Sequence, residues 1–463
     1  MDDRVVISGI GVISPFGVGR EAFWAGLADA RRGVSSMAGL EALPEAYRYG
    51  GQLSDFRPED IIGTKGLKYL NDATRLLLCT AELARRDARL EIAPDAAEDV
   101  GVVVASSFSN VGDCVGFYES LLSPAERTNP LRFPNLFINI AGGNLAIRLG
   151  IRGLNTTVTN GATSSLDALQ YGLTALRCAR ARVLLVGGLE VLSPALVEGF
   201  WRAGMLGDTM APRPFDRRRR GLILAEGCGV LVLERADAVR DRGAPVYGVV
   251  AGYGSVPVET GDEAVAAGEA IAEAMRRALA AAGIRIDEVD WVAAGAGSSP
   301  SGDRGEAMAL RRLFAAEPHR LRTSAIKSMI GEAGAASGML QVIACLLAAE
   351  HDRVPPTVNC EEEDPACLVP AHVRDRSVPH TIRTAVVNSF DCDRAASLVV
   401  RRSDALPQEA PRRTHVGRDR LDALRRPDAL RRARAGQRTG EALPRRRARA
   451  RHRRDARRGA PVR

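Results

Sequence analysis

The residues that could carry chemistry form two small groups. Thr163 and Ser164 stand at the start of a predicted helix, where a hydroxyl becomes a nucleophile only if a base lies beside it. Lys327 and Glu332 lie five residues apart around a glycine, and such a pair could move a proton. Each group also has a structural role, because a hydroxyl can cap a helix and the two charges can pair. We expect the structural roles and keep the catalytic ones as the alternative.

No motif for a metal or an organic cofactor accompanies these residues. The eight Cys are scattered without a C-x-x-C pair, and the glycine-rich stretches lack the G-x-x-x-x-G-K-[ST] pattern. We therefore expect free thiols, no metal and no cofactor. The N-terminus reads MDDR and then a strand-like run, and no apolar run is long enough to span a bilayer. These features predict a cytoplasmic protein without a signal peptide or a membrane span.

Strand-like and helix-like segments alternate along the body of the chain. The 463 residues, 46% of them hydrophobic, suffice for one large domain or for two fused halves. Alternation predicts α/β layers with helices on the faces of sheets, and its recurrence suggests a duplication with a seam near 240–260. We predict halves at 1–245 and 246–403. Strands are expected at 5–10, 100–105, 156–159, 183–186, 229–233, 247–254, 289–294, 384–388 and 396–401, and helices at 67–90, 110–122, 135–149, 164–179, 264–282, 304–314 and 335–349.

The segment 404–463 differs from the body in composition. Residues 411–463 hold 20 Arg, no Lys and 5 acidic residues, so they carry +15 and leave −7 on the remainder. The segment contains no Phe, Trp, Tyr, Ile or Met, which predicts a disordered tail. An electrostatic arm for nucleic acid or an acidic partner is the alternative. Without aromatic residues for base stacking, we expect no specific nucleic acid.

Several motifs together resemble the β-ketoacyl synthase family. The strongest is the block formed by RPFD at 213–216, RG at 220–221 and AEGCGVLVLE at 225–234. The resemblance covers about residues 4–402 and implies the thiolase fold. That fold has two five-stranded sheets with helices between and outside them, an α-β-α-β-α layering, and a dimer across the nucleophile-side edge. Further matching segments are VVISGIGV at 5–12, SSLDAL at 164–169, KSMIG at 327–331, PPTVN at 355–359 and NSF at 388–390.

The chain departs from this family at the positions that do the chemistry. The position of the family's nucleophilic Cys is Ala162, and the two His positions are Gly295 and Glu332, whereas Lys327 is retained. The glycine-rich loop that follows NSF reads DCDR at 391–394. Alanine offers no lone pair to an acyl group and nothing replaces the imidazoles, so condensation by this chain alone is not expected.

The resemblance then implies a silent subunit of the chain-length-factor type. Such a subunit pairs with an active ketosynthase of a type II polyketide synthase, serves an acyl carrier protein and shapes the acyl tunnel. Ala162 departs from the Gln that these subunits usually carry at the Cys position. Two alternatives stay open: a divergent acyltransferase or decarboxylase that uses Glu332, Lys327 or a nearby hydroxyl, and a protein that binds an acyl group or an acyl carrier protein.

Two segments are expected, by resemblance, to form the tunnel gate and the dimer interface. Residues 108–118 place four side chains at i, i+3, i+4 and i+7, on one helical face, beside two glycines that leave room. Residues 132–137 add two aromatic side chains suited to a buried anchor. Ordinary core packing is the alternative for both segments. The gate candidates are Val111, Gly112, Cys114, Val115, Tyr118, Phe133 and Phe137.

Overall fold

The strands form one continuous sheet of two halves, which a single residue pair joins. The computed structural model describes residues 4–53, 55–122, 128–315 and 320–405. In this part of the chain the eleven-stranded sheet is joined in its middle only through Ile7 and Gly248. The first half runs β1 (Val5–Ser14), β8 (Gly227–Arg235), β7 (Val183–Glu190), β5 (Val100–Ala105) and β6 (Asn155–Val158), and β2 (Gly17–Val18) pairs with β1. The second half runs β9 (Gly248–Pro257), β15 (Arg394–Arg402), β14 (Thr384–Phe390), β10 (Trp291–Ala293) and β11 (Arg322–Ser324).

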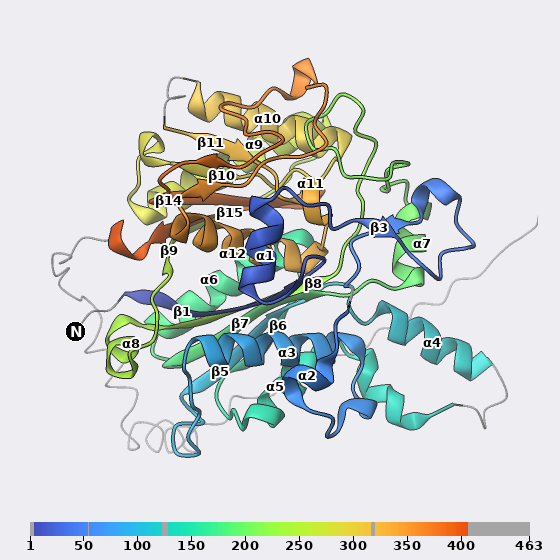
Figure 1. The fold of residues 1–463 in the computed structure, drawn as a ribbon, viewed down its shortest axis with the longest axis vertical. Helices are drawn as coiled ribbons and strands as arrows, with labels where there is room; N and C mark the ends of the chain where they lie inside the picture. The colour runs from blue at the N-terminus through green and yellow to red at the C-terminus, as the bar shows by residue number, and fades with distance from the viewer. Residues whose placement is uncertain (1–3, 54, 123–127, 316–319, 406–463) are drawn as a thin grey trace, which may run out of the picture. The chain divides into compact units, whose positions relative to one another are not determined.

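Helices fill the space between the two half-sheets and cover their outer faces (Figure 1). The middle layer holds α6 (Ser164–Arg177) and α12 (Ser337–Glu350), and every residue of α12 except Glu350 is buried. A helix that is apolar all round is expected where sheets lie on both sides. One outer layer contains α3 (Asp72–Asp87) and α5 (Ile140–Leu149), and the other α9 (Glu263–Ala282) and α10 (Pro300–Phe314). This arrangement confirms the predicted thiolase-like layering.

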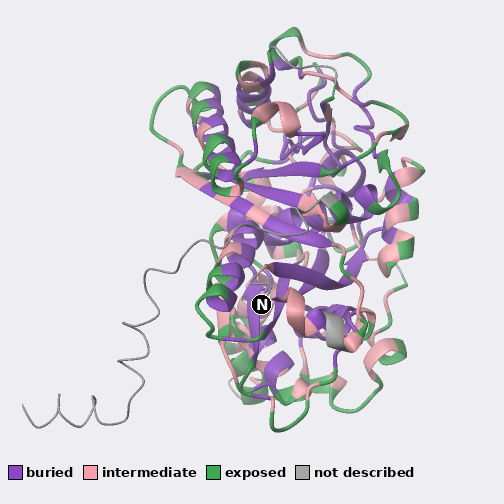
Figure 2. Ribbon diagram, turned by 90° about the vertical axis from the view of Figure 1, so that its left-hand side faces the viewer, coloured by how far each residue is buried: buried purple, intermediate pink, exposed green. Residues whose placement is uncertain are grey.

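Burial follows the layers (Figure 2). The central strands β1, β5, β7 and β8 and the helix α12 are buried, whereas the edge strand β6 is not, and the outer helices bury one face only, as amphipathic helices do. The remaining helices are α1 (Arg20–Ala28), α2 (Pro58–Ile62), α4 (Val111–Leu122), α7 (Pro194–Arg202), α8 (Ala236–Arg242) and α11 (Lys327–Ile330). Short strands pair as β3 (Ser35–Ser36) with β4 (Tyr49–Gly50) and β12 (Arg353–Val354) with β13 (Val378–Pro379). Short 3-10 turns are η1 (Glu45–Tyr47), η2 (Leu67–Tyr69), η4 (Pro130–Leu136), η5 (Gly161–Thr163), η6 (Ile286–Glu288), η7 (Gly334–Ala336), η8 (Pro365–Cys367) and η9 (Ser403–Ala405).

Two predicted helices each begin five residues later than expected. The helix expected at 67–90 starts as α3 only at Asp72, because the Asn71 side chain caps it by accepting the N–H of Thr74. The helix expected at 135–149 starts as α5 at Ile140. The turn η4 precedes it and contains Pro134, which has no N–H to donate into an α-helix.

Other expectations have mixed outcomes. All eight Cys are free, as predicted. No helix in the described ranges has the length and hydropathy needed to cross a membrane. The division at 245/246 stays a prediction, and the tail expected at 404–463 lies, beyond Ala405, outside the described residues.

Candidate functional site

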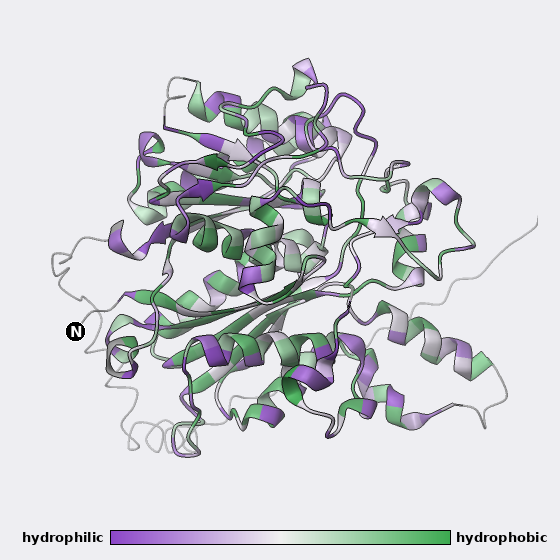
Figure 3. Ribbon diagram, viewed as in Figure 1, coloured by the Kyte–Doolittle hydropathy of each residue, from purple (hydrophilic) through white to green (hydrophobic). Residues whose placement is uncertain are grey.

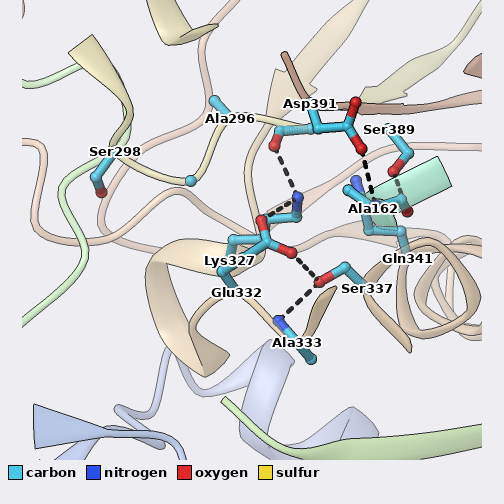
Figure 4. Close-up of polar contacts among 12 residues, drawn as sticks. Ala162, Ala296, Ser298, Lys327, Glu332, Ala333, Ser337, Gln341, Ser389 and Asp391 are labelled. Carbon is cyan, nitrogen blue, oxygen red and sulfur yellow. Dashed lines mark hydrogen bonds and ion pairs between the residues drawn. The ribbon is translucent and has the colours of Figure 1, made fainter. Parts of the chain in front are cut away.

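A cavity of about 1500 Å³ opens at the head of α6. Both halves of the chain contribute to its wall, and it brings together Ala162, Gly295 and Glu332, which are far apart in the sequence. Figure 4 shows Ala162 and Glu332 with the polar residues around them. The lining that bears on the chemistry consists of Phe108, Val111, Ala162, Glu190, Gly295, Gly297, Glu332, Phe390, Asp391 and Cys392.

Ala162 lies in η5, the short turn that directly precedes α6. Its N–H donates to Oδ2 of Asp391 at 3.1 Å, and its carbonyl oxygen accepts the Ser389 hydroxyl at 2.7 Å (Figure 4). Both polar groups of the backbone at this position are therefore engaged by the end of β14 and the turn after it. A methyl side chain supplies no nucleophile at the point where the helix dipole would favour negative charge.

Lys327 and Glu332 form the ion pair that the sequence suggested. Lys327 Nζ lies 2.7 Å from Glu332 Oε2 and 2.9 Å from the carbonyl oxygen of Gly295. Oε1 of Glu332 accepts the Ser337 hydroxyl at 2.7 Å. The Lys327 side chain is 1% exposed and that of Glu332 is 11% exposed. The acid at the position expected for the family's second His is thus held by two fixed partners.

The hydroxyls near Ala162 have no capping role, so that prediction is wrong. Thr163 Oγ1 donates to the carbonyl oxygen of Asn160 and to Asp167 Oδ2, both at 3.0 Å. Ser164 Oγ donates to the carbonyl oxygen of Gly161 at 2.7 Å and accepts the N–H of Asn160 at 2.8 Å. The turn η5 runs directly into α6, so both hydroxyls serve that turn. Both side chains are fully buried and neither lines the cavity.

Glu190 is a site residue that the sequence reasoning missed. It ends β7, and its carboxylate accepts the backbone N–H groups of Phe108 at 2.9 Å and of Ser107 and Ala335 at 3.3 Å. The pKa of Glu190 is raised to about 7, because burial and, to a smaller extent, nearby Glu332 outweigh the three N–H groups, which lower it. A lone acidic residue closing an otherwise apolar strand was the available signal.

The described lining of the cavity contains one thiol, that of Cys392, and no imidazole. Cys392 lines the cavity, but desolvation and the charges of Asp393 and Asp391 raise the pKa of its thiol, which disfavours thiolate. Among the described residues the His are His351, His372 and His380, and none lines the cavity. The described residues also contain no group of His, Cys, Asp and Glu able to hold a metal.

The gate candidates divide into two sets. Val111, the first residue of α4, lines the cavity, and Cys114 is partly buried against the carbonyl oxygen of Leu136. A Cβ on Gly112 would crowd Ser193. The other four side chains face outward and do not line the cavity of this chain: Val115, Tyr118, Phe133 and Phe137 are 39%, 66%, 51% and 51% exposed. Ordinary core packing therefore does not explain these four.

Known proteins resemble this chain over most of its length. Family models for the β-ketoacyl synthase N-terminal and C-terminal domains match residues 2–238 and 247–361. Nodulation protein E of Rhizobium sp. (strain N33) is 31% identical over 84% of this chain and 96% of its own length. A 3-oxoacyl-[acyl-carrier-protein] synthase 2 of Synechocystis sp. (strain ATCC 27184 / PCC 6803 / Kazusa) is 29% identical over 84% of this chain and 95% of its own length.

Solved structures agree with these sequence relatives. The ishigamide ketosynthase/chain length factor superposes with a TM-score of 0.80 at 28% identity, over 87% of this chain and 100% of that chain. AntDE:AntF, described as a type II PKS acyl-carrier protein in complex with its ketosynthase bound to the hexaketide, superposes with a TM-score of 0.77 at 25% identity, over 87% and 100% of the two chains.

Proposed function

The chain belongs to the β-ketoacyl synthase family, and from that premise we propose that it is a non-condensing subunit that pairs with an active β-ketoacyl synthase and shapes that partner's acyl tunnel. The observation that carries the proposal is the head of α6. Ala162 stands there without a nucleophile, and its N–H already donates to the Asp391 carboxylate. The chain keeps the fold and the cavity while lacking the groups that form a carbon–carbon bond.

The charge of the cavity also supports a silent role. Its acidic lining residues are Glu190, Glu259, Glu263, Glu332, Asp391 and Asp393, and the basic residue in the described lining is Arg220. Glu332 is paired with Lys327, and burial raises the pKa of Glu190 to about 7, so the negative charge comes mainly from the other four acids. A malonyl extender unit carries a carboxylate of its own. Like charges in a partly desolvated space repel each other, so this wall disfavours the extender that a condensing enzyme must bind.

An exposed apolar surface supports pairing with another subunit. It covers the outward face of α4 and the turn η4, and Figure 3 shows apolar residues along α4 and at its far end. The members, 39% to 89% exposed, are Val115, Tyr118, Leu121, Leu122, Leu131, Phe133 and Phe137. Contiguous apolar patches of this kind mark protein interfaces. We infer that a partner ketosynthase covers this α4–η4 surface. A solved structure similar to this chain is described as a ketosynthase/chain length factor, which supports the choice of partner.

The test is reconstitution with an intact ketosynthase from the same source. The two chains are co-expressed and purified, and acyl-carrier-protein substrates with a labelled acyl group are supplied to each protein alone and to the mixture. We expect a 1:1 complex that condenses acyl units, with the covalent label on the ketosynthase only. Condensation or covalent labelling by this chain alone would contradict the proposal and favour a divergent acyltransferase, in which case Glu332→Gln is the first variant to assay.

A further inference from the structure

We propose that the Asp391 carboxylate acts as a built-in anion at the head of α6, and that it bars acyl thioesters from this subunit whatever side chain stands at position 162. The N-terminus of a helix attracts negative charge through its unpaired N–H groups and its dipole. Here the N–H of Ala162, which points to that position, has a carboxylate oxygen of the same chain 3.1 Å away. The anion site is therefore already filled from within.

The carboxylate is held in place from both sides. Asp391 follows β14 directly, and its Oδ1 accepts the N–H groups of Asp393 at 3.0 Å and of Arg394 at 3.1 Å, which fixes the turn into β15. Its Oδ2 is then free to face the head of α6. The Ser389 hydroxyl ties the same hairpin to the carbonyl oxygen of Ala162. The Asp391 side chain thus bridges a β-hairpin and a helix that are 229 residues apart.

Gly161 makes the close approach possible. It has a positive φ of 61°, which glycine adopts without strain, and a Cβ at this position would collide with Oδ2 of Asp391. The helix head and the acidic turn therefore fit each other specifically, and any larger residue at position 161 would push the carboxylate away.

This contact has a chemical consequence for acyl transfer. When a thiolate attacks a thioester, negative charge develops on the carbonyl oxygen, and backbone N–H groups normally stabilise it. In this chain the N–H of Ala162 is occupied, and the adjacent charge repels both the thiolate and the oxyanion. Loss of the nucleophile and blocking of the anion site are then two separate barriers, which keep the growing chain on the partner.

The first test measures a thiol introduced at the helix head. Three proteins are compared: Ala162→Cys alone, Ala162→Cys with Asp391→Asn, and Ala162→Cys with Asp393→Asn. The control removes the same charge from the same turn, but Asp393 makes no bond to Ala162. Alkylation rates of the 162-containing peptide are followed against pH by mass spectrometry, so that the native cysteines do not interfere. We expect Asp391→Asn to lower the pKa of the introduced thiol by about one unit or more, which gives roughly tenfold faster alkylation near neutral pH, and Asp393→Asn to lower it less.

Equal thiol pKa values with and without Asp391, or an equal shift from Asp393→Asn, would overturn the proposal. If Asp391→Asn does not fold, judged by its melting curve, Asp391→Gly replaces it, because glycine suits a tight turn. A merely structural role of Asp391 would change the melting temperature without lowering the thiol pKa.

The second test measures acyl transfer from the N-acetylcysteamine thioester of a saturated fatty acid. The introduced thiolate attacks the carbonyl carbon, a new C–S bond forms, the old C–S bond breaks, and the released thiolate takes a proton from water. We expect the acylated peptide only when Asp391 is also replaced. Acylation of Ala162→Cys with Asp391 in place would overturn the proposal. Neither test contains the partner ketosynthase, so failure here is distinguishable from failure of the pairing role.

Discussion

Lys327 Nζ lies 2.7 Å from Glu332 Oε2, inside the wall of the cavity. The carbonyl oxygen of Gly295 and the Ser337 hydroxyl fill the next positions around the pair. Of the two positions that the sequence resemblance assigns to the family's His, one thus holds the acid of this ion pair and the other provides the carbonyl that the ammonium group binds. The pair and its two partners form a closed network of hydrogen bonds, a geometry that supports a structural role for this corner of the cavity.

Removing one member of this pair is expected to destabilise the fold. Glu332→Leu leaves the ammonium of Lys327 buried without a counter-charge, which costs about 3–5 kcal/mol of unfolding free energy. The double variant Lys327→Met with Glu332→Leu removes both charges and should recover most of that loss. Urea unfolding of the wild type, Glu332→Leu and the double variant measures these differences in unfolding free energy. As a control, Glu198→Leu breaks the exposed Arg202–Glu198 pair and should cost less than about 1 kcal/mol. A similar cost for Glu332→Leu and Glu198→Leu would contradict the network.

Glu190 makes stability depend on pH. Because burial raises its folded pKa to about 7, the folded protein holds a proton that the unfolded chain releases near pH 4.5. This contribution is complete at low pH and is lost as the pH rises toward 7, by up to roughly 3 kcal/mol. The unfolding free energy of the wild type relative to Glu190→Gln should therefore fall between about pH 4.5 and 7 and then level off. A difference that stays constant over this range, as expected for the surface variant Glu198→Gln, would refute the assignment.

Gly161 and Asp391 should show coupled stabilities. Gly161→Ala places a side chain at positive φ, which costs about 1–2 kcal/mol, and drives its Cβ into the Asp391 carboxylate. Gly150→Ala is the matched control, because Gly150 also has a positive φ of 69° but no atom lies within 4 Å of its Cβ position. We expect Gly161→Ala to cost more than Gly150→Ala, and Asp391→Ala to remove the excess in a double-mutant cycle. Strict additivity of Gly161→Ala and Asp391→Ala would show that they do not touch.

The sequence predicts the layered fold well and the site only in part. The run at 100–105 is β5 as expected, because six buried residues rich in Val and bounded by polar residues are too few for a buried helix. The sequence did not place the start of α5 correctly. Its apolar periodicity predicts a helix from residue 135, whereas the segment around Pro134 forms a 3-10 turn. The assignment of the family's Cys and His positions to residues 162, 295 and 332 stays a prediction, although the structure brings these three residues to one cavity. The contact of Asp391 with Ala162 was not visible in the sequence, because it joins residues that only the folded chain brings together.

The α4–η4 surface should govern association. Tyr118→Glu combined with Leu122→Glu introduces two charges into side chains that are 66% and 89% exposed. Because they face outward, the melting temperature of the isolated chain should change little, whereas the complex with the ketosynthase should weaken by tenfold or more. Met210→Glu, at a side chain 68% exposed elsewhere on the chain, is the control and should leave the complex intact. Analytical ultracentrifugation measures the association of each variant with the ketosynthase, and a melting curve measures the stability of the isolated chain. Unchanged association of the Tyr118 and Leu122 double variant would place the interface on another surface.

Product length from the reconstituted pair shows directly whether this chain shapes the acyl tunnel of its partner. The complex contains either the wild-type chain, Val111→Phe, which adds bulk to the cavity wall, or the control Met210→Phe, which adds it at a side chain 68% exposed outside the α4–η4 surface. Forcing extra methylenes into a filled space costs on the order of 1–3 kcal/mol, enough to stop elongation within a step or two. We expect mass spectrometry of the released acyl chains to show shorter products from the Val111→Phe complex than from the wild-type complex. We expect no product from this chain alone. The same product lengths from all three complexes, or condensation by this chain without its partner, would contradict the account.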